Sequence, residues 1–228
     1  MPPATARIEA RPARAPDLHA TAALHELALP HGFFAQLGPR FLAHYHETFV
    51  ASPHAAALVV IVDAGIVGFL VGPTDSTAHY QWVARRRGVR LARAALLALL
   101  RRPRLWVPFL QTRLTRYLRS LRRLLRRRGG AADVRPSDGA PPPDVAVLTH
   151  VAVAPTHRGR RIGAVLVEAF TQACREAGAD EIRLITDVAT GGRGFYQRLG
   201  WAEVTERPAS DGSLVIEFRR DLTEDWPR

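Results

Sequence analysis

The residues best suited to chemistry lie in one turn between an expected strand and an expected helix. Residues 154–164 of this turn read Ala-Pro-Thr-His-Arg-Gly-Arg-Arg-Ile-Gly-Ala. Backbone N–H groups at the start of a helix have no intrahelical acceptor, and the helix dipole adds partial positive charge there. Arg158, Arg160 and Arg161 would add guanidinium groups, which pair well with phosphate oxygens. The turn therefore indicates a pyrophosphate site, although a surface connection with solubilising arginines would have the same composition.

Two elements must position this turn. Residues 145–153 are rich in valine and are predicted to form the strand that precedes it. After the turn, apolar residues recur at the i, i+3, i+4, i+7 spacing of a helix that buries one face. They are Ile162, Val165, Leu166, Ala169, Phe170, Ala173 and Ala177. Gly178 follows, where a glycine commonly ends a helix, so the unit is predicted to be a strand, a turn and a helix.

The remaining segments alternate between strands and helices, which predicts an α/β fold with a mixed sheet. The predicted strands are residues 7–14, 57–62, 66–71, 145–153, 182–188, 202–205 and 214–219. The predicted helices are residues 17–29, 33–50, 162–177 and 193–199. Asp17 is expected to cap the first helix, and Asp63-Ala64-Gly65 is expected to form a hairpin turn.

Two sequence matches carry a family resemblance. Val-Ala-Val-Ala-Pro at 151–155, followed by Arg-Gly-Arg-Arg-Ile-Gly at 158–163, resembles the acetyl-CoA motif of GCN5-related N-acetyltransferases (GNAT family). That motif is a strand ending in Val-x-Pro and then Arg/Gln-x-x-Gly-x-Gly/Ala. Downstream, Gly-Phe-Tyr-Gln-Arg-Leu-Gly-Trp at 194–201 resembles the family's FYxxLGF signature. Arg161 replaces the first glycine of the motif, and Ala189 replaces a common asparagine.

The resemblance implies an acyl-CoA N-acyltransferase fold whose central strands splay apart, with acetyl-CoA as co-substrate and no metal. The opened backbone of Val151, Ala152 and Val153 would pair with the pantetheine arm of the co-substrate. The turn would bind its pyrophosphate through Arg158, Gly159, Arg160, Arg161, Ile162, Gly163 and Ala164. The backbone N–H of Arg161 stays available for this if the residue adopts ordinary helical angles.

The resemblance also implies catalytic roles. Tyr196 stands at the family's general-acid position, where its hydroxyl would protonate the departing thiolate; the alternative is a packing tyrosine. An amine acceptor must lose a proton, yet the position that often holds a glutamate base is Val147 here. His150 is therefore the candidate base, with Asp187 as a weaker alternative, and a structural role for His150 stays open.

Charge is distributed very unevenly. The net charge is +11, but 16 arginines and no acidic residue lie between Arg85 and Arg128, so the rest of the chain is mildly acidic. Cys174 is the only cysteine, which excludes an internal disulfide, and it is expected to be a buried small hydrophobe. A secretory signal and a membrane-spanning run are not recognised, so we expect a cytoplasmic protein.

The basic region forms a predicted helical insertion and linker, residues 80–143, within a single domain of residues 1–228. Stretches 89–100 and 105–125 place leucines on one helical face and arginines elsewhere. Such helices can lie on an anionic membrane or bind an acidic partner, or they can pack their leucines on the domain. Nucleic acid is disfavoured because only Trp106, Phe109 and Tyr117 accompany the arginines.

These observations favour an N-acetyltransferase that acts on a primary amine of a small molecule, such as an amino sugar or amine metabolite. One alternative is an enzyme that acetylates a protein or peptide amine. Another is a non-catalytic acyl-CoA-binding module that docks through its basic insertion. The acceptor and the oligomeric state are not indicated by the sequence.

Overall fold

The computed structural model describes residues 8–30, 32–102, 144–209 and 212–223. Its strands form two four-stranded sheets with the orders β1-β2-β3-β5 and β4-β6-β8-β7. The first sheet contains β1 (Ala10–Pro12), β2 (Ala55–Val62), β3 (Gly65–Pro73) and β5 (His150–Val153). The second contains β4 (Val145–Val147), β6 (Glu181–Asp187), β7 (Ala202–Pro208) and β8 (Leu214–Asp221). Antiparallel and parallel pairs both occur, as the predicted mixed α/β fold requires.

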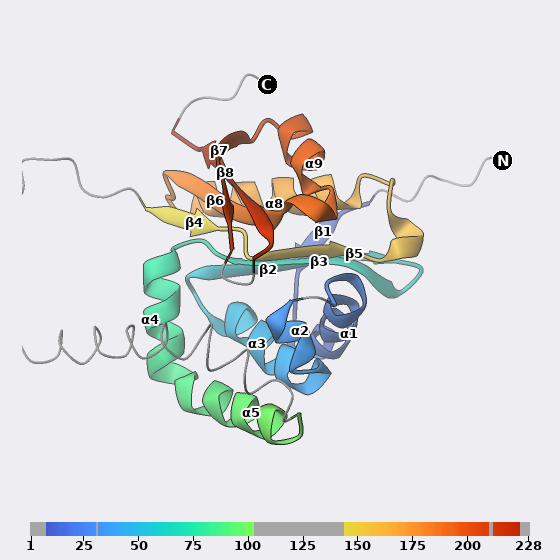
Figure 1. Ribbon diagram of the computed structural model, residues 1–228, viewed down its shortest axis with the longest axis vertical. Helices are drawn as coiled ribbons and strands as arrows, with labels where there is room; N and C mark the ends of the chain where they lie inside the picture. The colour runs from blue at the N-terminus through green and yellow to red at the C-terminus, as the bar shows by residue number, and fades with distance from the viewer. Residues whose placement is uncertain (1–7, 31, 103–143, 210–211, 224–228) are drawn as a thin grey trace, which may run out of the picture.

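Helices cover both faces of the first sheet (Figure 1). Helix α8 (Ile162–Glu176) lies on one face, where Leu166 and Phe170 are fully buried. On the other face lie α1 (Leu18–Ala28), α2 (Phe33–Gln36) and α3 (Pro39–Ala51). Their aromatic side chains pack with Phe69 of β3 in a second core. The sheet is therefore the middle layer of three, and its side chains alternate between two apolar environments.

The predicted hairpin is confirmed. Val62 pairs with Gly65 across the turn, and Asp63 and Ala64 both have positive φ, at +49° and +62°. Two consecutive residues with positive φ are what a two-residue turn matched to the twist of the strands requires. The turn sets the pairing of Ile61 and Val62 with β3, and a register shift between Val60 and Ile61 sets the pairing of the rest of the hairpin. Strand β5 pairs with the part of β3 beyond this shift.

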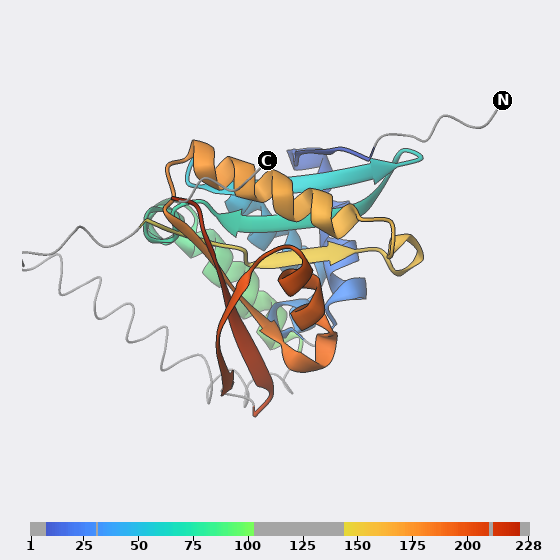
Figure 2. The ribbon, with the colours of Figure 1, turned by 90° about the horizontal axis from the view of Figure 1, so that it is seen from above.

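The predicted strand 145–153 is wrong in one respect, because it is two strands that belong to different sheets. Strand β4 pairs in parallel with β6, whereas β5 pairs antiparallel with β3. The chain changes partner over two residues: Leu148 N–H donates to the Arg183 carbonyl (2.9 Å), and Thr149 N–H donates to the Val71 carbonyl (3.1 Å). Beyond this point β5 and β6 run apart (Figure 2), which is the splay that the family resemblance implied.

Glycines in β3 allow the close approaches around this crossing. A Cβ atom on Gly72 would overlap the Val147 carbonyl oxygen and lie 2.8 Å from Cζ of Phe170. A Cβ atom on Gly68 would lie 2.8 Å from Cγ2 of Ile162. Because Gly68 and Gly72 have no side chains, β4 and α8 can pack directly against β3.

The predicted helix 33–50 is also wrong as a single element, because Gly38 interrupts it with φ = +88° and Pro39 begins a new helix. Proline suits a first helical position because its missing N–H would have no acceptor there. Asp17 does precede α1 as predicted, but its carboxylate does not cap the helix. It pairs instead with the Arg11 guanidinium (2.8 Å) and accepts from the Arg14 N–H (2.7 Å).

The described part of the basic insertion is helical. Helix α4 (Ser76–Arg86) leads to α5 (Gly88–Leu100), which packs beneath α3 (Figure 1). The rest of the insertion, including the predicted helical stretch 105–125 and the linker, lies outside the described residues. Among the residues described, no helix is both long and apolar enough to cross a membrane.

Substituting Gly72 tests whether the strand crossing depends on this close approach. Gly72→Ala should destabilise the fold by about 1–3 kcal/mol, because the new methyl overlaps a backbone oxygen that cannot rotate away. Gly65→Ala is the control, since its Cβ would sit at an ordinary 3.6 Å from the Val62 carbonyl oxygen. Urea unfolding followed by circular dichroism measures both, and equal stability of the two variants would contradict the explanation.

Candidate active site

The turn before α8 presents a row of backbone donors. Within the part of the chain that the structure describes, no acceptor pairs with the backbone N–H groups of residues 159–164. The Ile162 side chain is buried and anchors the turn to the sheet, whereas Arg158, Arg160 and Arg161 are exposed. The predicted phosphate-binding residues therefore lie together, with their N–H groups and arginines available to an anion at the start of a 15-residue helix.

Arg161 does not adopt the ordinary helical angles that were the condition for an available N–H group, yet its N–H group has no acceptor among the described residues. It lies in the left-handed region, with φ = +60° and ψ = 8°, two residues after Gly159 at φ = +78°. A non-glycine residue pays roughly 1–2 kcal/mol for this conformation. The turn thus keeps a backbone shape that glycine would adopt without cost, and successive N–H groups in such turns form a concave anion site.

Strand β5 has one partner strand and one open edge. Its pairing with β3 runs from His150 opposite Val71 to Val153 opposite Gly68. In the sheet order it is the last strand, so among the described strands none bonds to its other edge. Val151 and Val153 contact the core under α8, while Ala152 contacts the core under α1 and α3.

Helix α9 (Gly192–Arg198) brings the second sequence motif to the first. A Cβ atom on Gly163 would lie 3.2 Å from Cζ of Phe195 and 3.8 Å from Cγ2 of Val153. Gly163 therefore sits between α9 and the end of β5, and its lack of a side chain permits both contacts. The two motifs, more than 30 residues apart in sequence, meet at the open edge of β5.

Tyr196 lies on α9 with only 6% of its surface exposed. Its ring packs against Phe195, Trp201 and Phe218, with centroid distances of 5.0, 5.7 and 5.6 Å. Burial raises the pKa of its hydroxyl, because the phenolate would be poorly solvated. The side chain is therefore protonated at neutral pH, which a proton donor requires, and it also packs in the core.

His150 faces away from α8 towards the helices on the other side of the sheet. Its Nε2 lies 3.3 Å from the Tyr45 hydroxyl, and its ring centroid lies 4.6 Å from that of His25. Burial, and then the neighbouring His25 and His46, lower the pKa of His150 well below the ordinary histidine value. The imidazole is thus neutral at physiological pH, and the burial that lowers its pKa also disfavours its protonated form.

Two further buried histidines, His25 and His46, lie next to His150. The sequence analysis did not identify them as candidates. The Thr21 hydroxyl donates to the Leu18 carbonyl (3.2 Å), so its oxygen accepts from Nδ1 of His46 (3.0 Å). Neutral His46 then accepts at Nε2 from Nδ1 of His25 (3.0 Å). This chain fixes the tautomers of both rings and leaves Nε2 as the basic nitrogen of His25. Both histidines lie on the apolar faces of predicted helices, and this position is the sequence signal that could have identified them.

The remaining sequence candidates have other surroundings. Asp187 ends β6 and its carboxylate accepts from the Ala189 N–H (2.7 Å), so it caps the next turn. Cys174 is fully buried, as predicted, and burial raises the pKa of its thiol to about 12. The described residues contain no group of histidines, cysteines and carboxylates that could hold a metal ion.

Comparison with known proteins identifies the family of the chain. The model of the Acetyltransferase (GNAT) family matches residues 21–201, so the chain belongs to this family of enzymes, which transfer acyl groups from acetyl-CoA. A search of curated proteins finds no match.

Solved structures show the same fold. An acetyltransferase matches with 18% identity over 93% of this chain and 98% of its own, at a TM-score of 0.55. Aminoglycoside 6'-acetyltransferase type Ii matches with 15% identity over 96% and 98%, also at 0.55. Ribosomal-protein-S18-alanine N-acetyltransferase from Escherichia coli matches with 12% identity over 96% of both chains, at 0.54. At these identities the likeness concerns the fold and does not specify an acceptor.

The buried histidines predict how stability depends on pH. Burial lowers the pKa of His25 and His79 to about 4 and that of His46 to about 3. Below about pH 6.5 the unfolded chain binds protons that the folded chain excludes, so stability is lost as the pH falls towards these values. Each histidine contributes roughly 1.4 kcal/mol per pH unit to the slope.

Urea unfolding between pH 7 and pH 4.5 measures this slope. His46→Gln should reduce it by the contribution of one histidine, whatever its effect on stability at pH 7. Identical slopes for wild type and His46→Gln would show that His46 does not titrate as described.

Proposed function

We propose that this chain is an N-acetyltransferase that moves the acetyl group of acetyl-CoA to a primary amine of a small molecule. The observation that carries the proposal is the open edge of β5, with the α8 turn at its end and α9 beside it. An extended amide chain can add to such an edge as another strand would. The pantetheine arm of acetyl-CoA contains two amides and is a chain of this kind.

Acetyl-CoA fits the groups present. Its pyrophosphate would lie on the N–H groups of residues 159–164, helped by the exposed arginines. Its pantetheine amides would pair with the backbone of Val151, Ala152 and Val153. The acetyl carbonyl would then meet a backbone N–H near Val153, which would polarise the carbonyl and stabilise the oxyanion formed during attack.

The reaction requires one proton donor and one proton acceptor. The amine nitrogen attacks the acetyl carbon, the carbon–sulfur bond breaks, and its electron pair leaves on sulfur. Tyr196 is the proposed donor to that thiolate, supported by its protonated state and its position on α9 beside the turn. His150 is the proposed acceptor of the amine proton, supported by its position at the start of β5, beside the strand edge where the acetyl group would lie.

The surroundings of His150 support a compact acceptor. The rings of Phe34 and Tyr45 lie 6.4 and 5.7 Å from the His150 ring, measured between centroids. Helices α2 and α3, which carry these rings, thereby cover His150 on this side of the sheet. An amine on a small, slender molecule would reach a side chain covered in this way more easily than an extended polypeptide would.

A screen of small primary amines and of peptides, followed by release of CoA, tests the proposed function directly. Turnover with one or more small amines is expected, together with acetyl-CoA binding in the absence of an acceptor. Turnover with peptides alone would contradict the small-molecule assignment. Acetyl-CoA binding without turnover by any amine would favour a non-catalytic binding module.

Tyr196→Phe tests the proton donor, because it keeps the ring and removes the hydroxyl. With the amine found in that screen, kcat should fall by about 10²–10⁴-fold, the usual contribution of a general acid. Acetyl-CoA affinity and thermal stability should change little. Tyr80→Phe is the matched control, at a half-exposed tyrosine of α4, and should keep full activity. Full turnover by Tyr196→Phe would leave the tyrosine with a packing role only.

A further inference from the structure

Helix α5 has two apolar faces, and only one of them is buried. The inner face contributes Leu91, Ala94, Ala95, Ala98 and Leu99 to the core formed with α1 and α3. The outer face carries four large apolar side chains that remain more than half exposed. They are Val89 (77%), Leu96 (52%), Leu97 (52%) and Leu100 (58%). Single exposed leucines are common, but four on one side of a 13-residue helix form a continuous stripe.

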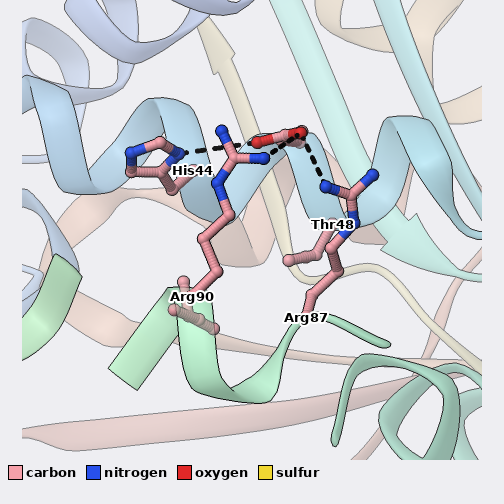
Figure 3. A pocket seen from close by; sticks show the side chains of 6 residues that line it. His44, Thr48, Arg87 and Arg90 are labelled. Atoms are coloured by element: carbon pink, nitrogen blue, oxygen red, sulfur yellow. Dashed lines mark hydrogen bonds and ion pairs between the residues drawn. The ribbon is translucent and has the colours of Figure 1, made fainter. Parts of the chain in front are cut away.

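An ion cluster fixes which face of α5 points outward (Figure 3). Glu47 of α3 accepts from Arg87 (3.0 Å) and from Arg90 (3.1 Å), and it lies 3.5 Å from Nδ1 of His44. Leu91 lies beside this cluster, together with Thr48. Because the two arginines come from the start of α5, the cluster and the buried face hold the helix in one rotation, with the stripe facing solvent.

The exposed stripe is accompanied by positive charge only. Residues 76–102 contain seven arginines and no acidic residue. Arg93 follows Val89 by four residues and precedes Leu96, Leu97 and Leu100 by three, four and seven, so it lies on the same side of the helix. Arg85, Arg86, Arg93 and Arg101 are exposed. The outer face of α5 therefore combines apolar side chains with the Arg93 guanidinium near its centre, and Arg101 is exposed at the C-terminal end of the helix.

We propose that this outer face of α5 docks on an anionic lipid surface, with the helix lying in the plane of the interface. The apolar stripe would enter the boundary between headgroups and acyl chains, and the arginines would pair with lipid phosphates. An acidic protein or a nucleic acid would satisfy the arginines but leave the stripe in water. A second copy of the chain, docked face to face, would bring like charges together. This inference is independent of the acetyl-transfer reaction.

Vesicle co-sedimentation of the full chain tests the proposal. Vesicles of phosphatidylcholine with phosphatidylglycerol should bind the protein at low salt, and vesicles of phosphatidylcholine alone should not. Leu96→Gln combined with Leu100→Gln should lower binding at least tenfold. Arg93→Gln combined with Arg101→Gln should lower it about 30-fold, because each arginine near an anionic surface contributes roughly fivefold.

Matched controls use exposed residues elsewhere. Leu27→Gln, at a leucine of α1 that is 64% exposed, and Arg207→Gln, on β7, should bind vesicles like wild type. Wild-type binding by the α5 leucine variant would overturn the proposal, and so would absence of wild type from the anionic pellet.

Three other outcomes would assign the face to another occupant and also overturn the proposal. A fall in melting temperature for the leucine variant, without vesicle binding by wild type, would show that residues 103–143 cover the stripe. A dimer in light scattering that the same variant dissociates would identify a second copy. If heparin retains the wild type and the leucine variant but not the arginine variant, and the wild type does not bind vesicles, the partner of this face is a polyanion.

Discussion

The transfer of one strand segment between two sheets is the constraint on which the site depends. Leu148 donates to β6 and Thr149 donates to β3, so the chain leaves one sheet and joins the other within two residues. Had the segment continued beside β6, both edges of β5 would be bonded and no edge would remain for a ligand. Gly72 makes the crossing possible, because any side chain there would overlap the Val147 carbonyl.

The groups that could bind a ligand or transfer a proton lie around the open edge of β5, because the strand segment changes sheets there. Helix α8 begins just beyond β5, and its turn leaves six consecutive N–H groups without an acceptor among the described residues. Gly163 admits the Phe195 ring, so α9, the helix that also carries Tyr196, packs beside the turn. On the opposite face of the sheet, the His150 ring contacts the buried His25 ring, which is hydrogen-bonded to His46. The proposed proton donor thus lies on the α8 side of the sheet, and the proposed acceptor lies on the side of α1 and α3.

Much of the fold could be predicted from the sequence because local signals were strong. The apolar stripe of α8 and the Asp63-Ala64-Gly65 hairpin depend on short-range periodicity and turn preferences. The split of residues 145–153 could not be predicted, because both halves are valine-rich and only their partners distinguish them. The break at Gly38 was missed because helical spacing of apolar residues continues across it.

The residues of the candidate site also fall into two groups, those that the sequence indicates and those that it does not. The turn residues and Tyr196 follow from motifs that are contiguous in sequence. The His25–His46 pair depends on two helices meeting over β5, which no spacing within one segment reveals. The left-handed conformation of Arg161 was also unexpected, because the strain is imposed by the turn on either side and not by the residue itself.

Amide hydrogen exchange with and without saturating acetyl-CoA, read at single-residue or short-peptide resolution, tests most directly whether the open edge of β5 binds acetyl-CoA. If acetyl-CoA binds at the splayed edge, protection should increase at residues 151–153 on the open edge of β5 and at residues 159–164 in the turn. The β2–β3 hairpin should exchange at unchanged rates and serves as the internal reference. Saturation by acetyl-CoA with no added protection on β5 would contradict the claim that the splayed edge is the binding site.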